Sequence, residues 1–176
     1  MPFTIERPGA DEYAAPYAPY IAALPEWDIL ALLERQRAEV VSLFRAIPEE
    51  RGTFRYQPGK WSIVDVINHL IDAERIFSVR ALRIARGDTT PLPGWDENEY
   101  AAAAGADGRS PDELATEFDA VRRATIALFQ SFDPEAIARR GTANNHSVTV
   151  RALIYIIAGH VEHHRRVLAE RYSVGA

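Results

Sequence analysis

Two histidines four residues apart, His160 and His164, are the residues of this chain best placed to do chemistry. On an α-helix this spacing puts both imidazoles on one face, one turn apart. That face is the apolar one, because the apolar positions around the pair follow the spacing of a core-facing stripe: Val150, Leu153, Ile154, Ile157, Val161 and Leu168. An imidazole buried without a partner costs free energy, and a shared metal ion would remove that cost. The pair therefore predicts a metal site.

A third histidine, His69, lies at the border of the apolar stripe of an earlier helical pattern. A lone histidine in such a position is more often hydrogen-bonded or half-exposed than a ligand. Packing of two helices in a bundle would, however, bring one side chain opposite the pair His160 and His164. Three imidazoles with open positions for water are the pattern of a catalytic metal site. Imidazoles suit zinc, nickel and iron, and copper as well, so the sequence leaves the identity of the ion open.

Three neighbouring residues are weaker candidates. His163 points to the flank of the helix, about 60° from His160, and is the main rival for one ligand position. His146 lies in a loop and more simply precedes or caps the last helix. Glu162 projects about 200° from His160, so it cannot act as the general base of a zincin, whose glutamate follows the first histidine directly.

Other residues could support the site from nearby. Asp72 and Glu74 follow His69; we expect both to be charges on a helix face, with Glu74 pairing an arginine across the bundle. The alternative is that one of them accepts a hydrogen bond from a ligand imidazole. In the long connection between helices, Trp95, Asp96 and Tyr100 are candidates for the mouth of a pocket, or for an aromatic anchor of that loop.

The composition fits one globular domain. The chain has 176 residues, of which 47% are hydrophobic and 26% charged, and a net charge of −5. That charge argues against a nucleic-acid partner, and no apolar run is long enough to span a membrane. The N-terminal residues lack the pattern of a signal peptide, so we expect a cytoplasmic protein. The absence of cysteine excludes disulfides and thiolate ligands, so a metal must be bound by histidine, carboxylate or water.

The elements that must position these histidines are four amphipathic helices. Ser62 with Asp65, and Ser110 with Glu113, have the spacing of helix-capping pairs. No segment shows the alternation of a strand, and 141–145 is expected to be a loop. We therefore predict an all-α four-helix bundle over 26–176, preceded by an extended N-terminal arm over 1–25, with helices near 27–47, 62–87, 110–132 and 148–172 and a long loop over 87–110.

Three segments of the chain also resemble a known family. Gly59-Lys60-Trp61-Ser62, followed by His69, Asp72 and Glu74, looks like the second-helix signature of the DinB-like superfamily, and His160-Val161-Glu162-His163-His164 resembles its fourth-helix signature. The stretch 90–100 is similar to the loop after helix two in the YfiT-like branch. The resemblance covers nearly the whole chain beyond the arm. It implies a bundle with one divalent metal ion held by His69, His160 and His164.

The resemblance also implies the kind of activity. Members of this superfamily include metal-dependent hydrolases and low-molecular-weight-thiol S-transferases. We therefore expect an enzyme in which the metal activates water or a small thiol toward a small-molecule substrate. The alternative is a non-catalytic bundle that binds a metal or a ligand. A homodimer is expected too, because two-fold dimers are the commonest soluble oligomers and because the N-terminal segment carries aromatic side chains that could form an interface: Tyr13, Tyr17, Tyr20 and Trp27.

Overall fold

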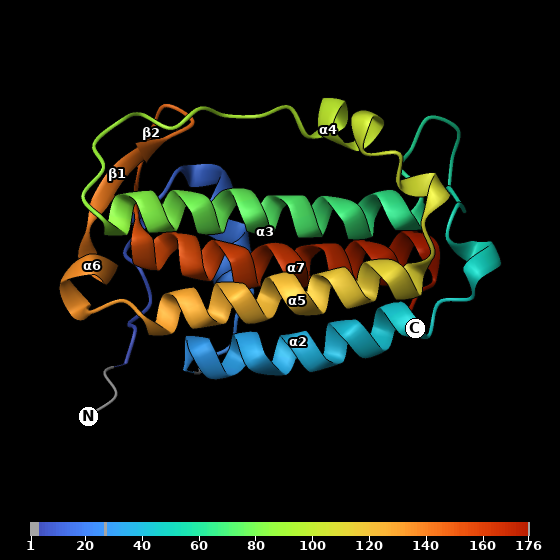
Figure 1. Cartoon of the computed structure of the whole chain (residues 1–176), viewed down its shortest axis with the longest axis horizontal. Helices are drawn as coiled ribbons and strands as arrows, with labels where there is room; N and C mark the ends of the chain where they lie inside the picture. The colour runs from blue at the N-terminus through green and yellow to red at the C-terminus, as the bar shows by residue number, and fades with distance from the viewer. Residues whose placement is uncertain (1–3, 27, 176) are drawn as a thin grey trace.

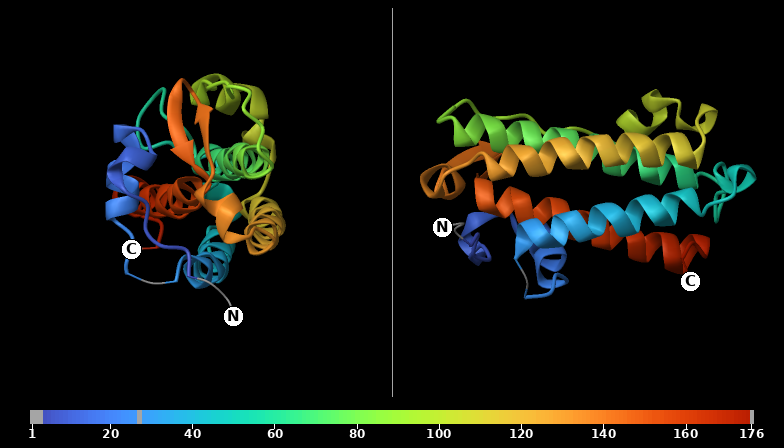
Figure 2. Two further views of the ribbon diagram at one scale, coloured as in Figure 1. Left: turned by 90° about the vertical axis from the view of Figure 1, so that its left-hand side faces the viewer. Right: turned by 60° about the horizontal axis from the view of Figure 1, so that its bottom comes forward.

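Four long helices lie side by side along the molecule in the computed structural model, which describes residues 4–26 and 28–175 (Figure 1). They are α2 (Ile29–Arg45), α3 (Ile63–Ala85), α5 (Pro111–Gln130) and α7 (Val150–Tyr172). The predicted four-helix bundle is therefore confirmed. Seen end on, the four long helices form a bundle, and the shorter elements lie outside it (Figure 2).

Side-chain caps fix where two of these helices begin. The Ser62 hydroxyl accepts a hydrogen bond from the Asp65 backbone N–H, and the Asp65 carboxylate accepts one from the Ser62 N–H at 2.8 Å. Ser110 and Glu113 form the same reciprocal pair at the start of α5. These caps satisfy backbone donors that have no partner inside the helix. They also set the register of α3, and with it the position of His69.

The N-terminal segment is folded rather than extended, which corrects our expectation. It forms two short 3₁₀ turns, η1 (Ala10–Glu12) and η2 (Ala15–Tyr17), and the short helix α1 (Ala18–Ala22). Pro16 and Pro19 lie in the first turns of η2 and α1, where the backbone N–H that proline lacks would have no partner within the helix. Trp27 lies outside the described residues.

Helix α1 packs directly on α7. A Cβ atom added at Gly159 would lie 2.4 Å from the backbone oxygen of Tyr20, so only glycine permits this approach. Further along, Glu12 accepts hydrogen bonds from Arg151 and Thr149, and the Tyr155 hydroxyl donates to the backbone oxygen of Ile5. Every residue of α7 from Ala152 to Val161 is consequently buried.

The long connection after α3 contains a helix of its own. Its second half forms α4 (Glu97–Ala104), which begins where the Asp96 carboxylate accepts hydrogen bonds from two backbone N–H groups and ends at Gly105 with φ 63°. Short turns complete the chain: η3 (Glu49–Arg51), η4 (Ala106–Gly108) and α6 (Pro134–Ala138). Because the side chains of α4 are mostly alanine and polar, it lacks the apolar periodicity by which the other helices are recognised.

A β-hairpin replaces the loop that we expected at 141–145. Strands β1 (Arg140–Ala143) and β2 (His146–Thr149) pair antiparallel, and Asn144 and Asn145 between them both have positive φ. Two consecutive residues at positive φ form the turn that matches the twist of a two-stranded hairpin. A backbone bridge from Leu92 to Ala143 then fastens the start of the long connection to β1. In the part of the chain that the structure describes, no helix is apolar over a stretch long enough to cross a membrane.

Candidate metal centre

Helices α3 and α7 bring three imidazoles to one point. His69 comes from α3, and His160 and His164 come from successive turns of α7. One ring nitrogen of each lies within 4.8 Å of the other two, and the Nε2 atoms of His69 and His160 are 3.0 Å apart. The packing of α3 on α7, which the sequence could not show, therefore places the three histidines together.

Burial keeps these imidazoles neutral. His69 and His160 are only 6% and 7% exposed. Burial, with a smaller effect of neighbouring histidines, lowers the pKa of His69 to about 4 and the pKa of His164 to about 3, and it holds the pKa of His160 well below its usual value. All three are therefore unprotonated at neutral pH, which is the form of histidine that binds metals.

The residues present fit a transition-metal ion. Three neutral nitrogen donors suit zinc, nickel or iron, whereas magnesium and calcium prefer oxygen ligands. One ring nitrogen of the cluster, Nδ1 of His164, is buried and has no hydrogen-bond partner among the described residues. A buried nitrogen of this kind costs free energy unless a proton donor or an ion satisfies it.

Aromatic side chains enclose the cluster. The Trp61 ring lies 4.9 Å from the ring of His69, measured between centroids. On the other side, the rings of Tyr20 and Phe77 lie 5.8 and 6.1 Å from that of His160. From the sequence, Trp61 was recognised only as part of a segment that resembles a family signature. Nothing in the sequence predicted that Tyr20 or Phe77 would contact the histidines. Their roles depend on how the N-terminal segment and α3 pack on α7.

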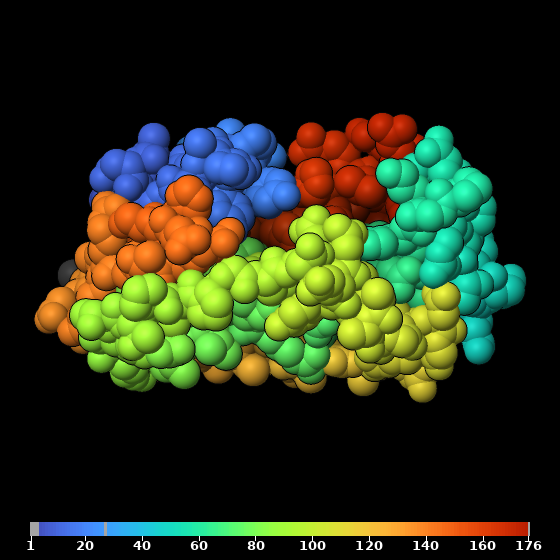
Figure 3. Space-filling model, turned by 90° about the horizontal axis from the view of Figure 1, so that it is seen from above, coloured from blue at the N-terminus to red at the C-terminus, as the bar shows by residue number. Residues whose placement is uncertain are grey.

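The cluster opens to the surface beside His164. A cavity of about 270 Å³ reaches that side chain, between α4, α7 and the segment before α3. Figure 3 shows the surface hollowed in this region. Apolar side chains and a few polar ones line the cavity, among them Tyr56, Lys60, Trp61, Glu97, Asn98 and Tyr172. Lys60 is the only lysine of the chain.

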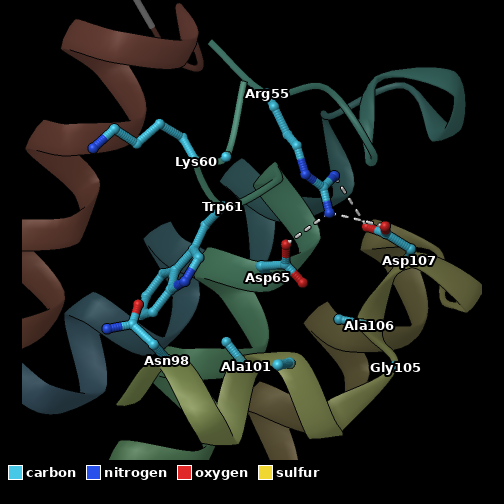
Figure 4. Close-up of a pocket in the computed structure, with 11 residues that line it drawn as sticks. Arg55, Lys60, Trp61, Asp65, Asn98, Ala101, Gly105, Ala106 and Asp107 are labelled. Carbon is cyan, nitrogen blue, oxygen red and sulfur yellow. Dashed lines mark hydrogen bonds and ion pairs between the residues drawn. The ribbon is translucent and has the colours of Figure 1, made fainter. Parts of the chain in front are cut away.

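A second cavity, of about 320 Å³, shares the Trp61 side of this opening. In Figure 4 the indole of Trp61 lies beside Asn98 of α4. Arg55 donates to Asp107 at 2.9 Å and to Asp65 at 3.2 Å, which ties the segment before α3 to both α3 and η4 (Figure 4). This bridge holds the backbone that carries Trp61 against the histidine cluster.

The three weaker candidates, His163, His146 and Glu162, do not join the cluster. His163 is half-buried against the ring of Tyr20, at 5.0 Å, on the flank of α7. His146 is exposed in β2. Glu162 accepts hydrogen bonds from Gln36 and Arg165 and therefore points toward α2, away from the cluster.

The two acidic residues after His69 also lie outside it. Asp72 accepts a hydrogen bond from Asn68, and no hydrogen bond joins it to a histidine. Glu74 forms a fully buried, two-pronged ion pair with Arg122 of α5, at 2.7 and 2.8 Å. We expected Glu74 to pair with an arginine across the bundle, and this pair has that geometry. Its complete burial was not expected, because charged residues are rarely placed in a core.

The three candidates in the long connection lie elsewhere. Trp95 packs on Phe77 with 5.4 Å between ring centroids, and Asp96 caps α4. Trp95 and Tyr100 line a different cavity, on the outer side of α3. The connection does reach the opening beside His164, but through Glu97 and Asn98. Trp95 therefore anchors the connection, as one of the two alternatives expected, and Trp95 and Tyr100 line a cavity that is not the one beside His164.

Known structures share this fold. YfiT from Bacillus subtilis, described as a probable metal-dependent hydrolase with an unusual four-helix bundle topology, matches with a TM-score of 0.73 at 15% identity, over 87% of this chain and 92% of that one. A mycothiol-dependent maleylpyruvate isomerase matches with a TM-score of 0.68 at 15% identity, over 89% of this chain and 64% of that one. At this identity the likeness shows the fold alone. No curated protein sequence matches this chain.

A family model describes most of the chain directly. The model of the DinB superfamily matches residues 32–168, a range that includes the four long helices almost completely and all three histidines of the cluster. The chain belongs to the DinB superfamily.

Proposed function

We propose that this protein is a metal-dependent enzyme in which His69, His160 and His164 hold one divalent ion, either zinc, nickel or iron. The observation that carries the proposal is the convergence of three neutral imidazoles within 4.8 Å of one another inside the bundle. An imidazole in a core is tolerated when its nitrogens are satisfied, and Nδ1 of His164 is not. A bound ion would accept a lone pair from a ring nitrogen of each side chain and so offset the cost of burying all three.

The ion would supply a nucleophile, because a divalent metal lowers the pKa of a bound water or thiol toward neutrality. The chain's own residues prepare the site. Trp61 on one side, and Tyr20 with Phe77 on the other, hold the imidazole rings and keep bulk water from them. The side next to His164 stays open to the cavity through which a substrate would approach.

The cavity supports a small-molecule substrate. Its volume of about 270 Å³ lies just below the range of roughly 300–1,000 Å³ that is typical of ligand pockets, so only a small molecule would fit it. The two structural relatives differ in their described reactions, since one is a probable hydrolase and the other depends on the thiol mycothiol. We therefore propose two reactions for the same site, hydrolysis of a small molecule or transfer of a low-molecular-weight thiol to an electrophile.

The test combines metal content with turnover. Protein purified without a histidine tag is analysed for metals, then incubated with ester, amide and epoxide panels, with and without added thiol. The proposal expects turnover that requires the metal and disappears in His160→Ala and His164→Ala. His163→Ala is the matched control and should keep both metal and turnover. Turnover unchanged in the metal-free protein would contradict the proposal.

One observation favours a second candidate, a bundle that binds a metal or ligand without catalysis. The Nε2 atoms of His69 and His160, at 3.0 Å, can share a proton and so satisfy each other without any ion. Stoichiometric metal binding with no turnover of any ester, amide or epoxide, with or without thiol, would support this candidate. The net charge of −5 supports a partner other than nucleic acid in both cases.

A further inference from the structure

Among the described residues, one buried charge has no counter-charge. Five Asp, Glu or Arg side chains are buried in the described part of the chain: Glu12, Asp65, Glu74, Arg80 and Arg122. Four of them form ion pairs, Glu12 with Arg151, Asp65 with Arg55, and Glu74 with Arg122. Arg80, which is 4% exposed, forms none with any described residue. Burial weakens the hydration of a guanidinium, so an anion is the partner that would stabilise Arg80 most.

The contacts of Arg80 position the guanidinium without neutralising it. One of its nitrogens donates to the backbone oxygen of Pro93. Its Cζ atom lies 4.8 Å from the centroid of the Trp95 ring and 5.9 Å from that of Phe77. Burial lowers the pKa of Arg80, but a guanidinium stays protonated at neutral pH. Four of its five N–H groups thus form no hydrogen bond to the described residues, and the Nε and Nη1 atoms keep some contact with solvent, so a ligand could reach them.

Arg80 lines a cavity on the outer side of α3. This space, which we call the Arg80 cavity, has a volume of about 360 Å³ and is lined mainly by apolar side chains and backbone: Ile76, Val79, Leu92, Pro93, Gly94, Trp95 and Tyr100. Two further arginines reach it, but Arg75 pairs with Glu117 and Arg83 pairs with Asp88. The guanidinium of Arg80 is therefore the one cation of this cavity that a ligand could neutralise without breaking an ion pair.

Two large apolar side chains of the lining remain exposed to solvent. Val79 of α3 and Tyr100 of α4, which both line the cavity, are 55% and 48% exposed. Large apolar side chains that gather beside a cavity often mark a binding site. A ligand with an apolar body would cover these two side chains, while its charged end reaches Arg80.

The outer wall of the cavity is held in place. The segment that follows α3 runs along the outside of that helix before it enters α4 (Figure 1). The backbone of Leu92 exchanges hydrogen bonds with Thr142 and Asn144 of the hairpin, both at 2.9 Å. Trp95 is anchored on Phe77. The cavity therefore exists before any ligand binds, which reduces the entropy that binding would cost.

We propose that the Arg80 cavity binds a small carboxylate with an aromatic or branched apolar body, whose acid group pairs with Arg80. A planar carboxylate matches the fork of a guanidinium, and the remaining lining offers apolar contact. This site is separate from the three-histidine cluster and does not depend on it, because Arg80 lies three helical turns beyond His69 on α3.

Calorimetric titration with 2-naphthoate tests the proposal, and 2-naphthamide serves as the neutral probe of the same shape. The wild-type protein should bind the acid about tenfold or more tightly than the amide, as expected for hydrogen bonds to a charged group. Arg80→Met should lose that preference. Arg83→Met is the matched control, because Arg83 lines the same cavity but is already paired; it should keep the preference.

Two further measurements keep the test decisive. If Arg80→Met unfolds, Arg80→Lys keeps the charge without the fork and should bind the acid several-fold more weakly than wild type while still preferring it to the amide. In NMR spectra, 2-naphthoate should shift the indole N–H signal of Trp95 in the wild-type protein. Equal affinity of the wild type for acid and amide, unchanged affinity in both Arg80 variants, or no binding at millimolar concentration would overturn the proposal.

Discussion

The Nε2 atoms of His69 and His160 face each other at 3.0 Å, although the two residues are 91 positions apart in the chain. The contact joins the first third of α3 to the middle of α7, and His164 lies one turn further along α7. Each ring of the cluster lies within 4.9 Å of the other two, measured between centroids. This arrangement makes the metal proposal testable residue by residue.

Replacing single histidines should separate ligands from neighbours. His69→Ala, His160→Ala and His164→Ala should each lose stoichiometric binding of a divalent ion, because two imidazoles remain where three are needed. Metal content after dialysis measures this. His163→Ala should keep a full equivalent, since its ring packs against Tyr20 instead. Full metal retention in two of the three cluster variants would show that the ligand set is wrong.

The buried pair of Glu74 and Arg122 should be strongly coupled. Arg122→Met leaves the Glu74 carboxylate in the core without its cation, which costs about 3–5 kcal/mol of unfolding free energy. The double variant Glu74→Leu with Arg122→Met removes both charges and should recover much of that loss. Urea unfolding measures both. A double variant less stable than Arg122→Met alone would contradict the assignment of the loss to an unpaired charge.

Glu12 should make stability depend on pH. Burial would raise its pKa, but hydrogen bonds from Arg151, the Gly9 backbone and Thr149 outweigh burial and lower the pKa to about 2. Because the folded pKa lies below the unfolded value of 4.5, the carboxylate stabilises the fold above pH 4.5, and this contribution is lost as pH falls toward 2.

The Glu12→Gln variant measures that contribution. At pH 7 it should be less stable than wild type by on the order of 2 kcal/mol, and the difference should shrink below pH 4.5. Asp11→Asn is the control, because Asp11 is exposed and its surface ion pair with Arg140 contributes little. A pH-independent difference for Glu12→Gln would refute a titrating carboxylate as its cause.

The homodimer stays a prediction. Its support from the N-terminal tyrosines has weakened, because Tyr17 packs on Phe77 and Tyr20 packs on His160 and His163 of the same chain. What remains is the frequency of two-fold dimers among soluble proteins. Sedimentation at roughly tens of micromolar protein should show a dimer, since association follows mass action. A monomer under those conditions would exclude it.

The parts of the fold that depend on local sequence were predictable. The caps at Ser62 and Ser110 and the apolar periodicity located α3 and α5 to within two residues at each end. The spacing of His160 and His164 placed both on one buried face, because helical geometry alone fixes that relation. The hairpin was missed because its signal, two asparagines at positive φ, is only two residues long.

What depends on tertiary packing could not be read from the chain. Arg122 and Gln36 are polar residues in helical patterns, and only the approach of α2, α3 and α5 buries them together. Arg80 is one more arginine in the helical pattern of α3, and its contact with the backbone of Pro93 depends on where the long connection packs. Local secondary-structure propensity carries no information about such tertiary contacts between segments that are distant in sequence.

Anomalous diffraction at the absorption edge of the metal found in the purified protein tests the central claim most directly. The account predicts one anomalous peak per chain, in bonding contact with a ring nitrogen of each of His69, His160 and His164. A peak bound elsewhere, or no peak in crystals grown with zinc, nickel or iron, would contradict it.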